Sequence, residues 1–232
     1  MAVTRGTSVA GNSGGLGTGF TIASVTCSGS DRYLVVSVAF SATGASVSSV
    51  TFNTSEALTF VDARNAGSGG TQCRVERWAL VAPSATTANI AVVTSSAISC
   101  GIAVPYSGVD QSTPRDATVK GNGADTAPTL TSAFAWGGGG DSQDMSVVWR
   151  NGTYTFTADA GVTQVQQTTS GSGSSHVGLA ILSDADTETG KVMGALSTST
   201  GWGIIGVNLN EVSAGGSSIA AISAGYHNQG LR

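Results

Sequence analysis

Hydrophobic and polar residues alternate along most of the chain, as they do in β-strands that bury one face in a core. Gly, Ser, Asn and Asp separate the alternating segments, and no stretch sustains a helical period. The clearest segments are Leu34, Val36, Val38 and Phe40 in the first half, and Met145, Val147 and Trp149 followed by Ile205, Val207 and Leu209 in the second. The pattern therefore predicts an all-β protein.

The spacing of these segments is typical of one large β domain. Short strands recur at regular intervals, which predicts an antiparallel β-sandwich, jelly-roll-like, over residues 19–212. Residues 1–18 are rich in Gly and Ser and are expected to form an extended segment. Residues 213–232 are expected to be a linker and a C-terminal arm, because apolar residues return after a Gly/Ser run. The polar insert 121–141 is interpreted as a surface loop of the sandwich.

Two local predictions are more specific. Within Cys73–Val81 the alternation is broken, and we interpret the face that carries Trp78 and Leu80 as the buried one. Asn151–Gly152 is a signal for a type I′ turn. It predicts a hairpin in which the segment 154–158 returns along the strand that precedes the turn.

Charge is sparse in this sequence. Only 10% of the residues are charged, 33 are Gly, and the formal net charge is −4. A typical globular domain carries roughly a quarter charged residues, so surface polarity here must come mainly from hydroxyls, amides and backbone. The basic residues are scattered and form no cluster that would neutralise phosphates, which argues against nucleic-acid binding.

Neither a membrane nor classical secretion is indicated by the pattern. No apolar run approaches the roughly 20 residues that span a bilayer, and no apolar segment precedes the first Gly-rich stretch. Cys27, Cys73 and Cys100 fall in step with apolar neighbours, so we expect reduced thiols in the core. This composition suits assembly in a bacterial cytoplasm.

No cofactor or metal is predicted. Two histidines and three apolar-patterned cysteines are too few for a tetrahedral zinc site. Residues 184–190 place carboxylates at alternate positions before Gly190, as in part of a calcium loop. The acidic ligand that would complete such a loop is missing, because Lys191 and Val192 follow. We therefore expect a solvated acidic turn.

The sequence offers no convincing catalytic set. Ser13 lies in a segment similar to the serine loop of trypsin-like proteases, but no His or Asp precedes it. His176 lies at the entry to a strand and is expected to face solvent. A glycosidase needs two carboxylates that flank its substrate, and the candidates are Asp141, Asp144 and Asp159. The sequence cannot pair them, so a protein that is not an enzyme is expected, with glycan degradation as a minor alternative.

Aromatic side chains could serve a glycan in another way. Trp136, Trp149, Trp202 and Tyr154 are candidates for a sugar-stacking platform. Trp149 and Tyr154 follow the strand alternation, which favours core positions for them. Trp136 adjoins a Gly-rich loop and is expected at an exposed interface.

One segment points more directly at a function. Val104 to Pro114 reads Val-Pro-Tyr-Ser-Gly-Val-Asp-Gln-Ser-Thr-Pro. An alternating apolar run ends at Tyr106, and the chain then breaks on Gly108 and Pro114, as a core strand does when it leaves a sheet. A strand followed by this turn resembles a group of tailed-phage virion proteins and phage-like repeats in bacterial genomes.

The resemblance extends over most of the stretch from Arg32 to Pro114. Its motifs are the strand Tyr33–Val38, the segment Val50–Thr59 with its valine-threonine pattern, and the strand Glu76–Pro83. Two departures are Ala79, where the group commonly has an aromatic residue, and Pro105, which interrupts the strand before Tyr106. The remaining half of the chain matches the group only in style.

The resemblance implies a structural protein of the virion that assembles in the host cytoplasm. The favoured hypothesis is a capsid decoration or cement protein, a homotrimer that binds the major capsid protein across subunit junctions. The alternative is a carbohydrate- or receptor-binding module of a tail or fibre. The C-terminal arm supplies the candidate contacts to the capsid or to a neighbouring protomer, which are Ile219, Ile222, Tyr226 and Leu231.

Overall fold

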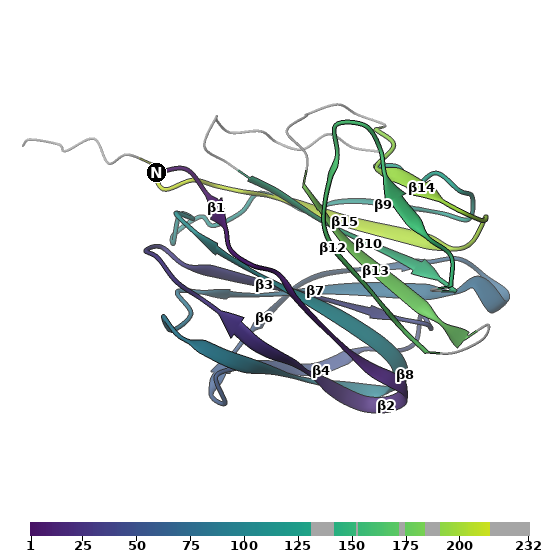
Figure 1. Cartoon of the computed structure of the whole chain (residues 1–232), viewed down its shortest axis with the longest axis horizontal. Coiled ribbons are helices and arrows are strands. Elements are labelled where there is room, and N and C mark those ends of the chain that lie inside the picture. Colours follow the sequence, from purple (N-terminus) through teal and green to yellow (C-terminus); the bar gives the residue numbers. More distant parts are fainter. Residues whose placement is uncertain (131–141, 152, 172–174, 184–190, 214–232) are drawn as a thin grey trace, which may run out of the picture.

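The computed structural model describes residues 1–130, 142–151, 153–171, 175–183 and 191–213. Two antiparallel sheets pack face to face in a jelly-roll-like sandwich, which confirms the predicted all-β fold (Figure 1). The first sheet contains β1 (Thr4–Arg5), β2 (Val9–Thr26), β3 (Tyr33–Phe40), β4 (Val47–Phe52), β5 (Glu56–Ala57), β6 (Thr59–Ala66), β7 (Cys73–Val81) and β8 (Thr87–Ser107), with a 3₁₀ turn, η1 (Gly69–Thr71), between β6 and β7.

The second sheet is smaller. It contains β9 (Val119–Gly123), β10 (Ser142–Arg150), β12 (Thr163–Ser170), β13 (Val177–Ser183) and β15 (Trp202–Leu209), in the order β12-β13-β10-β15-β9. A separate ribbon of β11 (Phe156–Ala158) and β14 (Gly194–Leu196) lies beside it. In the part of the chain that the structure describes, no helix is long and apolar enough to cross a bilayer.

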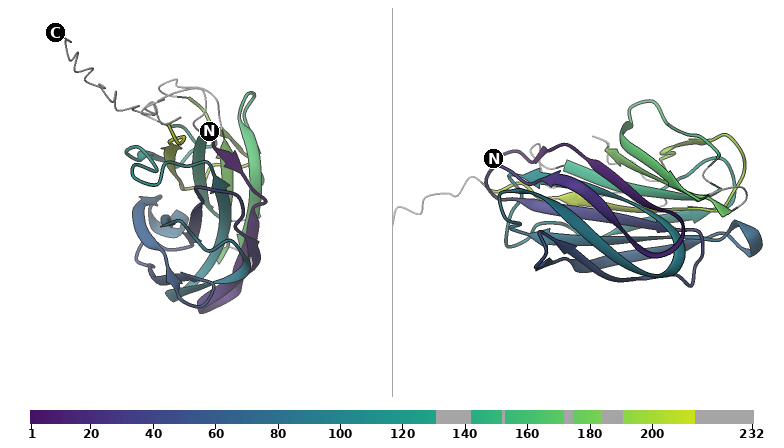
Figure 2. Two further views of the ribbon diagram at one scale, coloured as in Figure 1. Left: turned by 90° about the vertical axis from the view of Figure 1, so that its left-hand side faces the viewer. Right: turned by 60° about the horizontal axis from the view of Figure 1, so that its bottom comes forward.

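Strand β8 is the longest element and organises the first sheet. One edge of β8 pairs with β2 along most of its length, and Figure 2 shows these two strands running together. The other edge pairs with β4 and then, further along, with β3. Strands β3 and β4 therefore lie end to end along a single edge, and the loop of residues 41–46 connects them.

Three apolar clusters fill the molecule. The first lies between the sheets, where Val75 and Ile102 meet Leu179 and Ile205. The second fills the curled side of the first sheet around Phe40 and Phe52, and the third covers the outer face of the second sheet around Trp149. Both faces of β3, β10, β13 and β15 are thus covered, so these strands are buried almost throughout.

The predicted burial of β7 was wrong in its direction. Cys73, Val75 and Ala79 face the core between the sheets, whereas Trp78 and Leu80 are only partly buried on the opposite face. The reason is Arg77, which shares the more deeply buried face and is 1% exposed. A charged residue on that face interrupts the apolar alternation and makes the other face look like the inner one.

The predicted hairpin at Asn151–Gly152 was also wrong. Strand β10 pairs with β13 on one edge and β15 on the other, and Phe156–Ala158 pairs with β14. Asn151 does adopt a left-handed φ of 63°, and its carbonyl accepts a hydrogen bond from the Tyr154 amide at 3.0 Å. The turn residue sets the local conformation, but the edges of β10 are already occupied by other strands.

Strands β2 and β9 cross the boundaries that the sequence suggested for the N-terminal segment and for the surface insert. The boundary at residue 18 lies inside β2, whose residues 9–12, 16 and 17 pair with β8 between Ala97 and Ala103. A Gly/Ser-rich segment still carries the backbone donors and acceptors that a sheet edge needs. Residues 121–123, assigned to the surface insert, are the end of β9. Residues 131–141 and 214–232 are outside the described residues.

Candidate functional site: a groove where the ladders of β8 are interrupted

The turn after β8 is built as the sequence predicts. Gly108 has a φ of 73°, and a Cβ there would lie 2.6 Å from the Ala2 carbonyl oxygen. The Asp110 carboxylate accepts hydrogen bonds from the amides of Ser112 (2.7 Å) and Thr113 (2.8 Å). These bonds hold the pKa of Asp110 below its ordinary value, since they favour the charged form.

This turn joins the two sheets. The Asp110 amide donates to the Asn210 carbonyl (2.9 Å), and the Val212 amide donates to Gly108 (3.0 Å). The terminal amine of Met1 also donates to the Val212 carbonyl, at 2.8 Å. The turn after β8 therefore acts as a joint between the end of β8 and the end of β15.

Asp144 does not meet a partner carboxylate at an open site. It is fully buried between the sheets, where the Arg77 guanidinium and the Tyr106 hydroxyl both donate to its carboxylate. Arg77 Nη1 also donates to the Asp144 carbonyl and to Ser146 Oγ, each at 3.0 Å. Burial and the neighbouring carboxylate raise the pKa of Tyr106 well above its ordinary value. Asp159 is exposed just after β11, and Asp141 lies outside the described residues.

The other candidate catalytic or metal-binding residues have structural roles, in hydrogen bonds or in the core. Ser13 Oγ donates to the Gly15 carbonyl (2.6 Å) and accepts from the Ser99 amide (3.1 Å). Cys27, Cys73 and Cys100 are buried free thiols, as expected, and burial raises the pKa of Cys73 to about 12. Among the described residues, no group of three His, Cys, Asp or Glu could hold a metal ion. Residues 184–190 lie outside that part.

The aromatic residues do not assemble a sugar platform from the members that the structure describes. Trp149 and Trp202 are 0% and 3% exposed in the third cluster, which confirms the core interpretation of Trp149. Tyr154 packs against the same cluster and is partly buried. Trp136 and the predicted arm contacts Ile219, Ile222, Tyr226 and Leu231 are outside the described residues.

A groove opens where regular pairing of β8 stops. On one edge, pairing with β4 ends at Thr94 and pairing with β3 begins at Ser99. On the other edge, the register of β2 shifts between Asn12 and Leu16. The resulting space is about 450 Å³, which is within the range of small-molecule sites. We call it the β8 groove.

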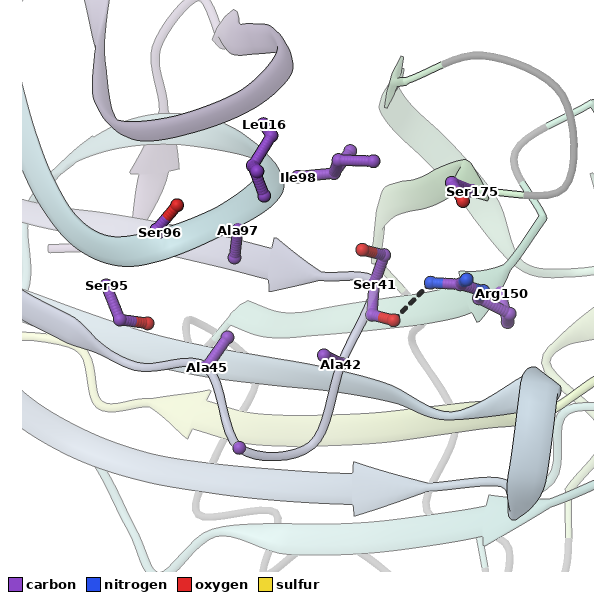
Figure 3. Close-up of a pocket in the computed structure, with 11 residues that line it drawn as sticks. Leu16, Ser41, Ala42, Ala45, Ser95, Ser96, Ala97, Ile98, Arg150 and Ser175 are labelled. Carbon is purple, nitrogen blue, oxygen red and sulfur yellow. Dashed lines mark hydrogen bonds between the residues drawn. The ribbon is translucent and has the colours of Figure 1, made fainter.

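The lining of the β8 groove is mixed (Figure 3). Ala45 and Ala97 are buried apolar residues of the lining, 6% and 4% exposed. Leu16 stands at the mouth with 75% of its surface exposed, near Ile98. The remaining lining is mostly serine, from the β3–β4 loop, from β8 and from the start of the segment before β13.

Ser95 is held in place within this lining. Its Oγ accepts a hydrogen bond from the Ser46 amide at 3.0 Å, and its own amide donates to the Ser46 carbonyl at 2.9 Å. The hydroxyl proton of Ser95 has no acceptor among the described residues. It is therefore a positioned donor at the groove.

Arg150 is the charged residue of the groove and comes from the second sheet. Its backbone is held by two hydrogen bonds: the Arg150 amide donates to the Gly201 carbonyl (2.9 Å), and the Arg150 carbonyl accepts from the Thr200 hydroxyl (3.0 Å). Its Nη1 donates to the Ser41 carbonyl, whereas its Nε is buried without a hydrogen-bond partner. Within the described ranges Arg150 makes no ion pair.

The pattern of apolar and polar residues does not reveal this groove. Its residues come from β2, β8, the β3–β4 loop, β10 and the segment before β13, and only long-range pairing brings them together. The available signals were weak: Ser95–Ser96 breaks the apolar alternation of β8, and Gly14–Gly15 breaks that of β2. Comparisons of this chain with family models, curated proteins and solved structures found no match.

Proposed function

We propose that this protein is a structural subunit of a phage virion, a β-sandwich that decorates the capsid by binding rather than by chemistry. The observation that carries the proposal is an exposed apolar surface on the first sheet. Phe60 and Val81 are 46% and 43% exposed and line one shallow pocket together with the partly buried Leu80, and the partly buried Trp78 packs against the Phe60 ring. We call these four residues the Phe60 patch.

The Phe60 patch has the properties of a contact surface. The rings of Phe60 and Trp78 pack edge to face with centroids 5.5 Å apart, which limits the side-chain freedom that binding would cost. A shallow pocket of about 360 Å³, lined partly by Phe60, Val81 and Pro114, lies beside them. Burial of such apolar area stabilises a complex by about 25 cal/mol per Å² before ordering costs.

The location of the patch links it to the resemblance. The stretch that resembles virion proteins, Arg32 to Pro114, comprises β3 to β8 and the following turn, and the Phe60 patch lies on β6 and β7 within it. We propose the major capsid protein as the partner of this surface. Further copies of the chain, in a homotrimer, would bury additional weakly polar surface.

The sandwich is also suited to bear load. Its sheets are linked along one side by Lys120 and Asp62 (3.0 Å) and along the other by the hydroxyls of Ser13 and Ser170 (3.4 Å). These links join β9 to β6 and β12 to β2. Together with the apolar cluster between the sheets, these contacts join the two layers, which is a property that a cement protein needs.

Binding to particles tests the proposal. Purified virions should contain the protein in copy numbers comparable to those of the capsid subunits, and the recombinant protein should bind undecorated heads and raise their thermal stability. The double variant Phe60→Ser/Val81→Ser should bind weakly. Val93→Ser is the matched control, since Val93 is equally exposed (46%) but outside the patch.

Two results would contradict this function. One is retention of full head binding by the patch variant, which would remove the Phe60 patch from the contact. The other is a copy number of only a few per particle, which would favour the alternative function, a carbohydrate- or receptor-binding module of the tail. The β8 groove is the specific observation that favours this alternative.

A further inference from the structure

We propose that the β8 groove binds an acidic saccharide and that the Arg150 guanidinium receives its carboxylate. This binding does not depend on whether the protein decorates the head, because the Phe60 patch and the groove share no residue. Three features of the groove favour such a ligand: the unsatisfied guanidinium of Arg150, the mixed lining, and the gap in strand pairing that forms the groove.

Arg150 carries a charge without a local counter-charge. Its guanidinium has five N–H donors, and the hydrogen bond that the described residues provide for it is the one from Nη1 to the Ser41 carbonyl. A buried Nε without a partner is costly and leaves that edge of the group unsatisfied. A carboxylate matches the guanidinium edge with two parallel hydrogen bonds.

The rest of the lining fits a sugar frame. Serine hydroxyls, including the positioned donor of Ser95, match the hydroxyl groups of a saccharide. Leu16 and Ile98 offer apolar surface to its C–H face. The single cation of the groove, Arg150, suits a ligand with one carboxylate on each sugar residue. Phosphate sites in proteins typically gather several cations or a row of backbone amides.

The groove exists before any ligand arrives, because the backbone creates it. Residues 95–98 of β8 lie between the residues that pair with the end of β3, at Phe40, and with the start of β4, at Val47, so the pairing on that edge has a gap. The Ser41 amide donates to the Ile98 carbonyl (3.2 Å), and the Ser95 amide donates to Ser46 (2.9 Å), which fixes the loop across the gap. A preformed site avoids part of the ordering cost of binding.

Titration calorimetry with two matched trisaccharides tests the proposal. Trigalacturonate carries carboxylates, and maltotriose is its uncharged counterpart. We expect trigalacturonate to bind at least about tenfold more tightly than maltotriose, since hydrogen bonds to charged groups supply that difference. Its affinity should fall with added salt, because the groove is open to solvent. Equal binding of the two, or no binding of trigalacturonate at millimolar concentration, would overturn the proposal.

Variants assign the binding to the groove. Arg150→Gln should abolish the preference for trigalacturonate, and Arg64→Gln, an arginine on β6, should leave it unchanged. Leu16→Asp is the alternative variant if Arg150→Gln unfolds. Leu16 is exposed, so the substitution should retain the fold, and the new aspartate should repel the ligand carboxylate. An unchanged affinity in Leu16→Asp, or a loss in Arg64→Gln equal to that in Arg150→Gln, would exclude the groove. Head binding measured on the same variants should not change, so this test and that of the proposed function fail separately.

Discussion

Arg77 and Arg150 both reach from one sheet to the other, in opposite directions, and their surroundings differ in kind. Arg77 extends from β7 into a buried network with Asp144, Tyr106 and Ser146, where each charge has a partner. Arg150 extends from β10 to the edge of the first sheet and meets one backbone carbonyl, that of Ser41. The first arginine completes the core, and the second leaves hydrogen-bonding capacity open. A residue's partners, more than its type or strand, separate a structural charge from a binding charge.

Removal of the partner of Arg77 should have the largest effect. Asp144→Ala leaves the guanidinium buried (1% exposed) without a counter-charge, and loss of one member of a buried pair costs about 3–5 kcal/mol. Denaturant unfolding at neutral pH measures this loss. The double variant Arg77→Met/Asp144→Leu should recover much of it, because both charges are removed together. If Asp144→Ala lowers the free energy of unfolding by less than about 1 kcal/mol, Arg77 does not depend on Asp144 for its place in the core.

Alkaline pH should weaken the same network. The pKa of Tyr106 is raised above its ordinary value of 10.0, so the folded state holds this proton more tightly than the unfolded state does. The contribution of protonated Tyr106 to the free energy of unfolding is complete below pH 10.0. It is lost as pH rises from there toward the pKa of Tyr106 in the folded state. The buried thiols act in the same direction, so the wild-type curve must be compared with that of Tyr106→Phe.

The comparison isolates the tyrosine. Tyr106→Phe should lower stability at neutral pH by about 1–2 kcal/mol, because Asp144 loses a donor, and should lose less stability than the wild type at high pH. If the stability of the two proteins falls in parallel as pH rises, Tyr106 does not cause the pH dependence in this range.

Arg150→Gln should have the smallest effect on stability. Loss of the hydrogen bond to the Ser41 carbonyl costs about 0.5–1.5 kcal/mol, and removal of the unsatisfied Nε offsets part of it. Thermal unfolding beside Asp144→Ala gives the contrast directly. A loss as large as that of Asp144→Ala would place Arg150 among the structural charges and weaken the case for a binding groove.

The fold followed from the sequence where local pattern decides the structure. The strands around Val36, Val147 and Val207, and the turn at Gly108, are where alternation and turn chemistry place them. The errors arose where distant partners decide: β15 and β13 occupy the edges of β10 and prevent the hairpin at Asn151.

The candidate site could not be found in the same way. The buried face of β7 was misassigned because the partner that makes Arg77 acceptable in the core, Asp144, is on another sheet. The β8 groove is defined by a gap between β4 and β3 and by the reach of Arg150 across the sheets. Neither is encoded in a short window of sequence.

The contact between Met1 and Val212 has a mechanical consequence. Residue 1 and the end of the described sandwich meet at the turn of Gly108, where the Met1 amine also lies 3.8 Å from the Glu211 carboxylate. A force that separates the end of β8 from the end of β15 would load this small corner first, because the Asp110–Asn210 and Val212–Gly108 hydrogen bonds join the two strands there. The corner could thus part and re-form under strain while the β8 groove and the Phe60 patch kept their shape.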